Sequence, residues 1–202
     1  MAENAPDNLV ELDPANSIWE RFFSVFPLVV VGSRERDGSD DLAPKHLAIP
    51  LSWKNHFGFV CTPRHSTYRN VLHNGEFAVT YVRPSQAVLA SLAASPRCDD
   101  GSKPIAGALP TFRAKQVDAP LLRDGYLFLE CSLHRIIDDL DENSLIIGQV
   151  QTARVAADAL RSSDRDDGDL VVASPLLAYL YPGRFAEVAE SALMPMPEGF
   201  KR

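Results

Sequence analysis

The segment from Cys61 to Asn70 (CTPRHSTYRN) combines hydroxyl groups and arginines where an extended stretch gives way to a predicted helix. The N-terminus of a helix presents unpaired backbone N–H groups and the positive end of the helix dipole. Together with the guanidinium of Arg64 and the hydroxyls of Ser66 and Thr67, it could hold a phosphate dianion. The alternative is that Ser66 or Thr67 only caps the helix while the arginines face solvent, because such caps are common. The local chemistry leaves both interpretations open.

A second segment, residues 41–52 (DLAPKHLAIPLS), precedes the first by one strand and is expected to run beside it in a sheet. An extended backbone can donate and accept hydrogen bonds along the edge of a planar heterocycle. Leu47, Ile49 and Leu51, or the residues that alternate with them, could pack on its face. The alternative is an ordinary strand with two proline interruptions, and the segment taken alone favours that alternative.

Cysteine and histidine spacing gives no support for a metal site or a disulfide framework. The three cysteines contain no CxxC pair, and the five histidines contain no HxxxH or HExxH pair. Cys61 and Cys131 fall on alternating apolar faces and are predicted to be core residues. His134, close to two aspartates, is expected to be a partly exposed histidine at a strand edge.

Length and charge restrict the class of protein. The chain has 202 residues, enough for one domain with its own core, and a formal net charge of −7, which argues against nucleic-acid binding. The N-terminus lacks the basic and apolar regions of a secretory signal, and the longest apolar run, residues 26–31, is too short to span a bilayer. With its unpaired cysteines, the chain is expected to be cytoplasmic and to lack a membrane anchor.

Short apolar stretches separated by turn signals predict a mainly β domain, antiparallel, with peripheral helices. The expected strands lie at residues 27–33, 45–52, 57–62, 77–81, 127–134 and 145–150, with a hairpin turn at 36–39. One short helix should end before Gly75, which suits the left-handed position after a helix, and another should cover residues 86–94.

The two ends of the chain are predicted to lie outside this domain. Residues 1–26 are expected to form an arm that ends in a short helix, since apolar residues recur there at near-helical spacing: Ile18, Trp19, Phe22, Phe23 and Phe26. The domain itself should span residues 27–190, and residues 191–202 should form a C-terminal tail.

Several motifs in order resemble the flavin-reductase-like, FMN-binding split-barrel family, which includes flavoredoxin. The first are PLVVVGS from Pro27, Asp37-Gly38, Leu42-Ala43-Pro44, the Arg64-x-Ser-Thr-x-x-Asn70 segment and NGEFAV from Asn74. The similarity continues through VDAPL from Val117, LECSL from Leu129, LIIGQV from Leu145 and YLYPGRF from Tyr179. It covers most of the chain between residues 27 and 188.

The resemblance implies a six-stranded antiparallel split β-barrel that works as a homodimer, with FMN bound at the subunit interface. Residues expected near the flavin ring are Lys45, His46, Leu47, Ala48, Ile49, Pro50, Leu51 and Ser52. Those expected at the ribityl phosphate are Thr62, Arg64, Ser66, Thr67 and Asn70, and a C-terminal motif near the flavin contributes Tyr181 and Arg184.

The sequence departs from the family pattern at two places. Many members have Asn-Leu-Ala-Pro followed by Ser, whereas here Asp41 replaces the Asn and His46 replaces the Ser. The short-chain NAD(P)H:flavin reductases also tend to carry an Asp-His pair before the Ile-Ile-Gly strand, where this chain has Asp-Glu-Asn-Ser at residues 141–144. Flavin binding is therefore better supported than reduction by a nicotinamide.

The resemblance implies an FMN-dependent oxidoreductase that uses NAD(P)H or another donor, with a possible monooxygenase partner. A cation near flavin N1 would favour the reduced flavin, and Lys45, His46 and Lys54 are the candidates, although each could be a solvated surface group. The main alternative is a non-catalytic FMN carrier, sensor or electron-transfer module. A third possibility is a split barrel that has lost its flavin.

Overall fold

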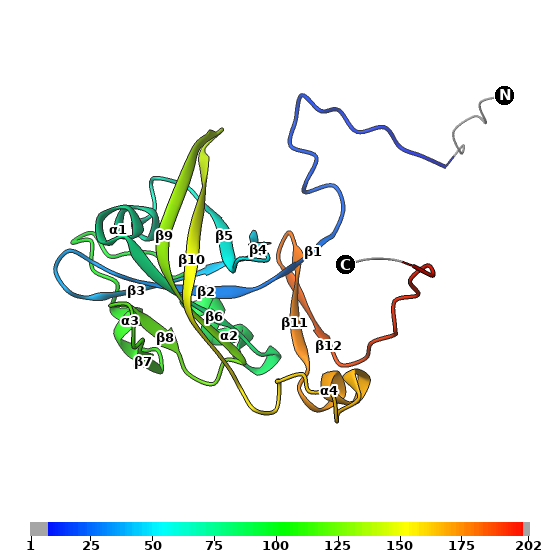
Figure 1. The fold of residues 1–202 in the computed structure, drawn as a ribbon. Coiled ribbons are helices and arrows are strands. Elements are labelled where there is room, and N and C mark those ends of the chain that lie inside the picture. The colour runs from blue at the N-terminus through cyan, green and yellow to red at the C-terminus, as the bar shows by residue number, and fades with distance from the viewer. Residues whose placement is uncertain (1–7, 200–202) are drawn as a thin grey trace.

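The computed structural model describes residues 8–199 and is built around one large antiparallel sheet. Its seven strands follow the order β3-β2-β6-β9-β10-β5-β4 (Figure 1). They are β2 (Val29–Arg34), β3 (Asp40–Lys45), β4 (Ala48–Ser52), β5 (His56–Cys61), β6 (Glu76–Tyr81), β9 (Leu127–Leu140) and β10 (Asn143–Val155). The mainly β, antiparallel prediction is confirmed, with seven strands in the sheet where six were expected.

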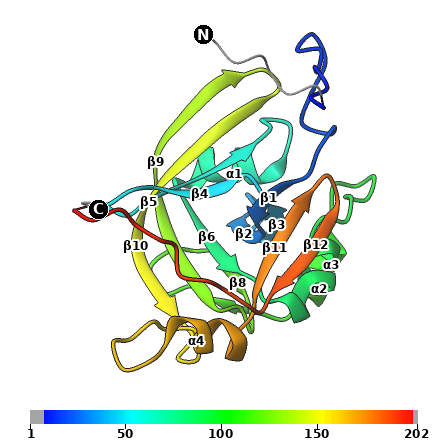
Figure 2. The ribbon, with the colours of Figure 1, turned by 90° about the vertical axis from the view of Figure 1, so that its right-hand side faces the viewer.

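The two edges of this sheet are joined by a very short link. β3 and β4 are the edge strands, yet only His46 and Leu47 separate them in the chain. Because an extended residue spans about 3.3 Å, this link can bridge only about 10 Å. The sheet must therefore curl until its edges approach each other, which gives the open barrel seen in Figure 2.

The hairpin predicted at residues 36–39 is present, but its second strand is not the predicted one. The Glu35 N–H donates to the Ser39 carbonyl at 2.9 Å, and β2 pairs with β3. β3 ends at Lys45 because its register partner, Val29, is the first residue of β2. Residues 48–52 then form β4, which pairs with β5 at the opposite edge.

Two smaller sheets complete the β structure. β1 (Ser24–Pro27), β11 (Leu176–Tyr181) and β12 (Arg184–Val188) form one sheet in the order β1-β11-β12. β7 (Thr111–Arg113) pairs with β8 (Pro120–Leu122) in the other. β1 and β11 bring together two ends of the chain that are about 150 residues apart, beside the edge of the barrel (Figure 1).

The short helix predicted before residue 27 is wrong for the residues that the structure describes. Residues 18–23 form turns and bends, and residues 24–27 form β1. The backbone of β1 bonds to β11, a partner that local spacing could not reveal, and Trp19 and Phe23 stay 60% and 63% exposed. Residues 1–7 of the predicted arm and 200–202 of the predicted tail lie outside the described residues.

Short helices surround the barrel. They are α1 (Ser66–Asn74), the 3-10 turn η1 (Pro84–Gln86), α2 (Ala87–Leu92), α3 (Pro104–Ala108) and α4 (Asp167–Ala173). Gly75 follows α1 with φ +72°, as predicted. The predicted side-chain cap is wrong, because the helix begins one residue after His65, whose side chain makes no capping bond, and Ser66 and Thr67 lie in the first turn.

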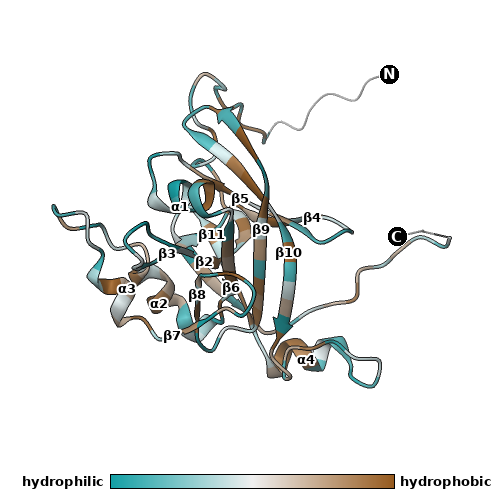
Figure 3. Cartoon of the chain, turned by 60° about the vertical axis from the view of Figure 1, so that its left-hand side comes forward, coloured by the Kyte–Doolittle hydropathy of each residue, from teal (hydrophilic) through white to brown (hydrophobic). Residues whose placement is uncertain are grey.

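The core lies on both faces of β2. Val29 and Val31 pack with Phe59 and Phe77 inside the barrel, whereas Val30 faces a second cluster beneath α2 and α3. Cys61 and Cys131 are buried in the first cluster, which confirms the core prediction. Figure 3 shows hydrophobic colouring along parts of the central strands and mixed hydrophobic and hydrophilic colouring along the β9–β10 ribbon.

Candidate functional site

A cavity of about 300 Å³ opens where α1 begins, between β3 and the loop after α2; we call it the basic pocket. Five of its lining residues carry cationic side chains: Lys45, Arg64, Arg69, Arg97 and Lys103. Ser66 and Thr67 also line it, and its one acidic lining residue is Asp41. Such a lining is suited to an anionic group.

The local fold explains why these groups meet. β5 ends at Cys61, the His65 N–H bonds back to the Thr62 carbonyl at 3.0 Å, and α1 begins at Ser66. The first backbone N–H groups of a helix have no partner within it, so the start of α1 at Ser66 and Thr67 can offer donors to a ligand in the pocket. The helix dipole adds positive potential at the same end.

Thr62 carries the clearest sign of an unfilled polar interaction. Its Oγ1 is buried and has no hydrogen-bond partner among the described residues. A buried hydroxyl without a partner costs about 1–3 kcal/mol, so such groups call for an explanation. Thr62 does not itself line the basic pocket but lies two residues before Arg64, which does, so a polar ligand there could supply a partner after a local shift of the Thr62 side chain.

Two arginines of the basic pocket have hydrogen-bonding partners of different kinds. Arg69, which the sequence analysis did not select, donates to the Ser66 hydroxyl at 2.9 Å and has no carboxylate partner among residues 8–199. Arg64 pairs with Glu142 at the tip of the β9–β10 ribbon, and both side chains are mostly exposed, at 73% and 62%. An exposed ion pair contributes little stability, so Arg64 can leave it at low cost.

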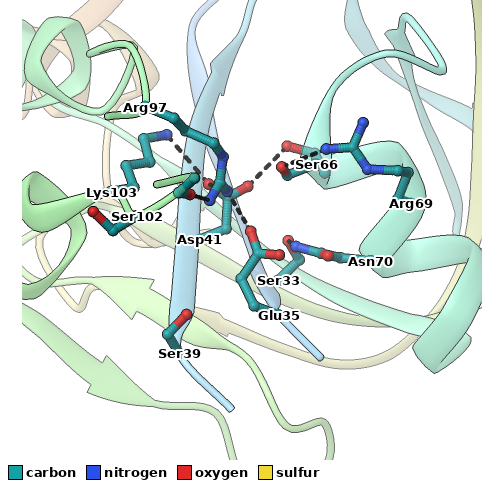
Figure 4. A network of polar contacts seen from close by, with 12 residues as sticks. Ser33, Glu35, Ser39, Asp41, Ser66, Arg69, Asn70, Arg97, Ser102 and Lys103 are labelled. Atoms are coloured by element: carbon teal, nitrogen blue, oxygen red, sulfur yellow. Dashed lines mark hydrogen bonds and ion pairs between the residues drawn. The ribbon is translucent and has the colours of Figure 1, made fainter. Parts of the chain in front are cut away.

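Asp41 is almost fully buried in the wall of the basic pocket and accepts three bonds (Figure 4). Its carboxylate receives the Thr67 hydroxyl at 3.2 Å, Arg97 at 3.1 Å and Lys103 at 3.2 Å. Lys103 also donates to the Leu42 carbonyl at 2.7 Å, and Arg97 pairs in addition with Glu35. This network fixes the loop that carries Arg97 and Lys103 against β3.

A second cavity, of about 270 Å³, adjoins the first and is mostly apolar; we call it the apolar pocket. Pro44 and Ala94 line both cavities. The other lining residues are Leu28, His46, Ala87, Ala90, Ser91, Tyr179, Gly183, Arg184 and Phe185. Small aliphatic and aromatic walls of this kind suit a flat ring system.

His46 forms the aromatic wall of the apolar pocket together with the last strands. Its ring lies 5.3 Å from that of Tyr181, nearly parallel, and 4.9 Å from that of Tyr179. Burial, and to a smaller extent the charge of Lys45, lowers the pKa of His46 below its ordinary value. Its surroundings therefore favour the neutral imidazole.

The structure divides the sequence-predicted residues into groups. Lys45, Arg64, Ser66 and Thr67 line the basic pocket, and His46 and Arg184 line the apolar one. Other predicted residues lie outside both cavities: Leu47, Ile49, Pro50, Leu51 and Ser52 are exposed on β4 or beside it, Ala48 is in the core, Thr62 has a buried hydroxyl that lines neither cavity, and Asn70 donates to the Ser33 hydroxyl at 3.1 Å. Tyr181 lines neither cavity and contacts the site through the ring of His46.

Arg69, Arg97 and Lys103 are the pocket residues that sequence reasoning missed. Arg97 and Lys103 come from a stretch without regular structure, residues 95–103, and no sequence pattern connects this stretch with α1. Arg69 lies one helical turn after Ser66, so helical spacing was the available signal.

A metal-ligand cluster and a membrane-spanning helix each place requirements on the described part of the chain. Residues 8–199 contain no group of three or more His, Cys, Asp or Glu side chains placed to hold a metal ion. None of their helices combines the length and apolar character needed to cross a bilayer.

The fold resembles solved structures over nearly its whole length. Flavoredoxin of Desulfovibrio vulgaris (Miyazaki F) is 17% identical with a TM-score of 0.75, covering 95% of this chain and 100% of that one. An FMN-binding protein from Thermus thermophilus is 19% identical with a TM-score of 0.74, covering 94% and 100%. Nitrilotriacetate monooxygenase component B from Mycobacterium thermoresistibile is 12% identical with a TM-score of 0.68, covering 89% of each chain. These likenesses confirm the split-barrel fold.

Family membership rests on a separate comparison. No curated protein matches the sequence. The family model described as "Flavin reductase like domain" matches residues 24–188, from the start of β1 to the end of β12. The chain therefore belongs to the flavin-reductase-like family.

Proposed function

We propose that the chain is an FMN-binding oxidoreductase that moves hydride or electrons between NAD(P)H, or another donor, and flavin or a small acceptor. The observation that carries the proposal is the junction of a basic pocket and an apolar pocket through Pro44 and Ala94, with an unpaired buried hydroxyl on Thr62. FMN has the matching composition, a phosphate at one end and a flat ring at the other.

At the phosphate end, the groups that would hold the dianion are the Thr62 and Ser66 hydroxyls, the free N–H groups of α1, and Arg64 and Arg69. Charge-assisted bonds to phosphate are stronger than neutral ones. Arg64 would exchange its exposed partner, Glu142, for the phosphate. Lys45 lines the basic pocket, is only 9% exposed and adds a further positive charge there.

At the ring end, the bound flavin supplies hydride acceptance at N5, with negative charge developing around N1 and the C2 carbonyl. A fixed cation nearby would favour the reduced form. Of the three candidates, Lys54 is exposed and the surroundings of His46 favour its neutral form. Lys45 is buried without a carboxylate partner among the described residues, so we assign the cationic role to Lys45.

We further propose that the protein is a homodimer with FMN at the subunit interface. The edge strand β4, the residue before it and the turn after it expose apolar side chains: Leu47 at 41%, Ile49 at 50%, Leu51 at 38% and Trp53 at 95%. An exposed apolar edge strand is a site for association. These predicted ring-lining residues would reach a flavin only across such an interface.

A non-catalytic FMN carrier or electron-transfer module is the second candidate. Residues 141–144 (DENS), which form the turn after β9 and the first two residues of β10, stand where flavin reductases tend to have an Asp-His pair, so nicotinamide reduction has less local support. A monooxygenase component has a similar fold, and this similarity supports a monooxygenase partner as a proposal. The cytoplasmic location stays a prediction.

The test has two steps on the same sample. FMN is titrated into the protein and the change in flavin fluorescence is measured, and NADH or NADPH is then added without oxygen while flavin absorbance is followed. Saturable binding with bleaching faster than in a protein-free control is the expected result. Binding without accelerated bleaching by either nucleotide would favour the carrier, and absence of binding would contradict both candidates.

A further inference from the structure

Asp41 places a negative charge in the wall of a pocket that otherwise suits an anion. It is 2% exposed and is the one carboxylate among the residues that line the basic pocket. A buried carboxylate needs ionic and hydrogen-bonding partners, because removing it from water is costly. It finds them in Thr67, Arg97 and Lys103, which line the same pocket.

These bonds occupy the groups that would otherwise receive a phosphate. The Thr67 hydroxyl donates its only proton to Asp41. Lys103 divides its donors between Asp41 and the Leu42 carbonyl, and its side chain is only 9% exposed. Arg97 is held from a second side by Glu35, whose side chain is 18% exposed.

The charge balance of the pocket follows from this network. Of the five cationic side chains in the pocket, Arg97 and Lys103 are paired with Asp41, and Arg97 is also paired with Glu35. Arg64, Arg69 and Lys45 remain for a ligand, and Arg64 has its exposed partner Glu142. The Asp41 carboxylate itself repels a phosphate dianion at short range.

We infer that Asp41, assisted by Glu35, weakens the pocket's hold on phosphate so that FMN exchanges instead of being held permanently. The inference rests on the proposed function and deepens it. A protein that releases its flavin can pass reduced FMN to a separate acceptor. The network thus favours a reductase whose flavin is an exchanging substrate over a carrier that retains it.

Asp41→Asn is the direct test, because asparagine keeps the shape and an acceptor oxygen while removing the charge. FMN should bind about tenfold more tightly, chiefly through slower dissociation. Riboflavin, which has no phosphate, should bind with unchanged affinity. Unchanged or weaker FMN binding by a folded D41N protein would overturn the inference.

The double variant Asp41→Asn/Lys103→Gln is the matched control. It removes one negative and one positive charge from the same pair, so FMN affinity should return to within about threefold of wild type. It should also unfold at a higher temperature than D41N, which leaves Lys103 buried without its partner. A double variant that keeps the tenfold gain would contradict the role of Lys103.

Glu35→Gln covers the case in which D41N does not fold. This substitution removes the ion pair between Arg97 and Glu35. FMN should then bind about threefold more tightly, and riboflavin affinity should not change. No change would overturn the inference. If wild type shows no preference for FMN over riboflavin, the proposed phosphate site itself fails, a result distinct from failure of the Asp41 inference alone.

Discussion

His46 lies against Tyr181, with ring centroids 5.3 Å apart and ring planes inclined by 21°. The contact joins the link between the two edges of the barrel to β11, which the chain reaches some 130 residues later. The wall of the apolar pocket is therefore built from both ends of the domain. A change at His46 should disturb the ring end of the site without touching the phosphate end.

His46→Ala should weaken the binding free energies of FMN and riboflavin equally, by about 1 kcal/mol each, because an aromatic contact to the flavin ring is lost. Calorimetric titration of both ligands gives the comparison. A loss confined to FMN would place His46 at the phosphate instead.

Arg64→Ala should weaken FMN binding by about 1.5–3 kcal/mol, toward the lower end because wild-type Arg64 must leave Glu142. Riboflavin binding should not change. Arg165→Ala, at an exposed arginine in the loop before α4, is the matched control and should leave both affinities unchanged. Equal weakening of both flavins by R64A would remove Arg64 from the phosphate site.

Thr62→Val should have opposite effects on the stability of the ligand-free protein and on its affinity for FMN. Valine has nearly the shape of threonine and removes the unpaired buried hydroxyl, so the free protein should gain about 1 kcal/mol in unfolding free energy. FMN binding should weaken by a similar amount. Chemical denaturation and ligand titration measure the two effects, and a gain in stability without loss of affinity would mean that Thr62 does not meet the ligand.

The sequence predicts those elements of the fold that depend on short-range residue patterns. Alternating residues in β5 and β6 and the left-handed Gly75 follow from short-range rules. β1 was missed because its partner is β11, far away in the sequence. Arg97 and Lys103 were missed because a loop places them, and only the bonds of Asp41 to that loop reveal the connection.

Stability should fall as the pH drops below 6.5. Partial burial, followed by the charges of Lys45 and Arg64, lowers the pKa of His65 from its ordinary 6.5. Just below pH 6.5, His65 therefore binds a proton more readily in the unfolded chain than in the folded protein. The free energy of unfolding accordingly decreases as the pH falls toward the pKa of His65 in the folded protein. His65→Gln should flatten part of this dependence in denaturation curves. An identical slope in H65Q would show that His65 makes no contribution.

Ile49→Lys should produce monomers and release flavin if the exposed face of β4 forms the subunit interface, because a buried unpaired charge opposes association. Val172→Lys, at a 60% exposed residue of α4, is the matched control and should leave the oligomeric state unchanged. Sedimentation with absorbance detection of the flavin reports both properties. Flavin retained by a demonstrated I49K monomer would refute the shared site.

The most direct test of the account is the ratio of the FMN and riboflavin dissociation constants of the wild-type protein, measured by equilibrium titration in low salt. The two ligands differ only in the phosphate, which we assign to the basic pocket. We expect FMN to bind at least about tenfold more tightly, the contribution of one or more charge-assisted bonds. Equal affinities would contradict the assignment of the phosphate to the basic pocket.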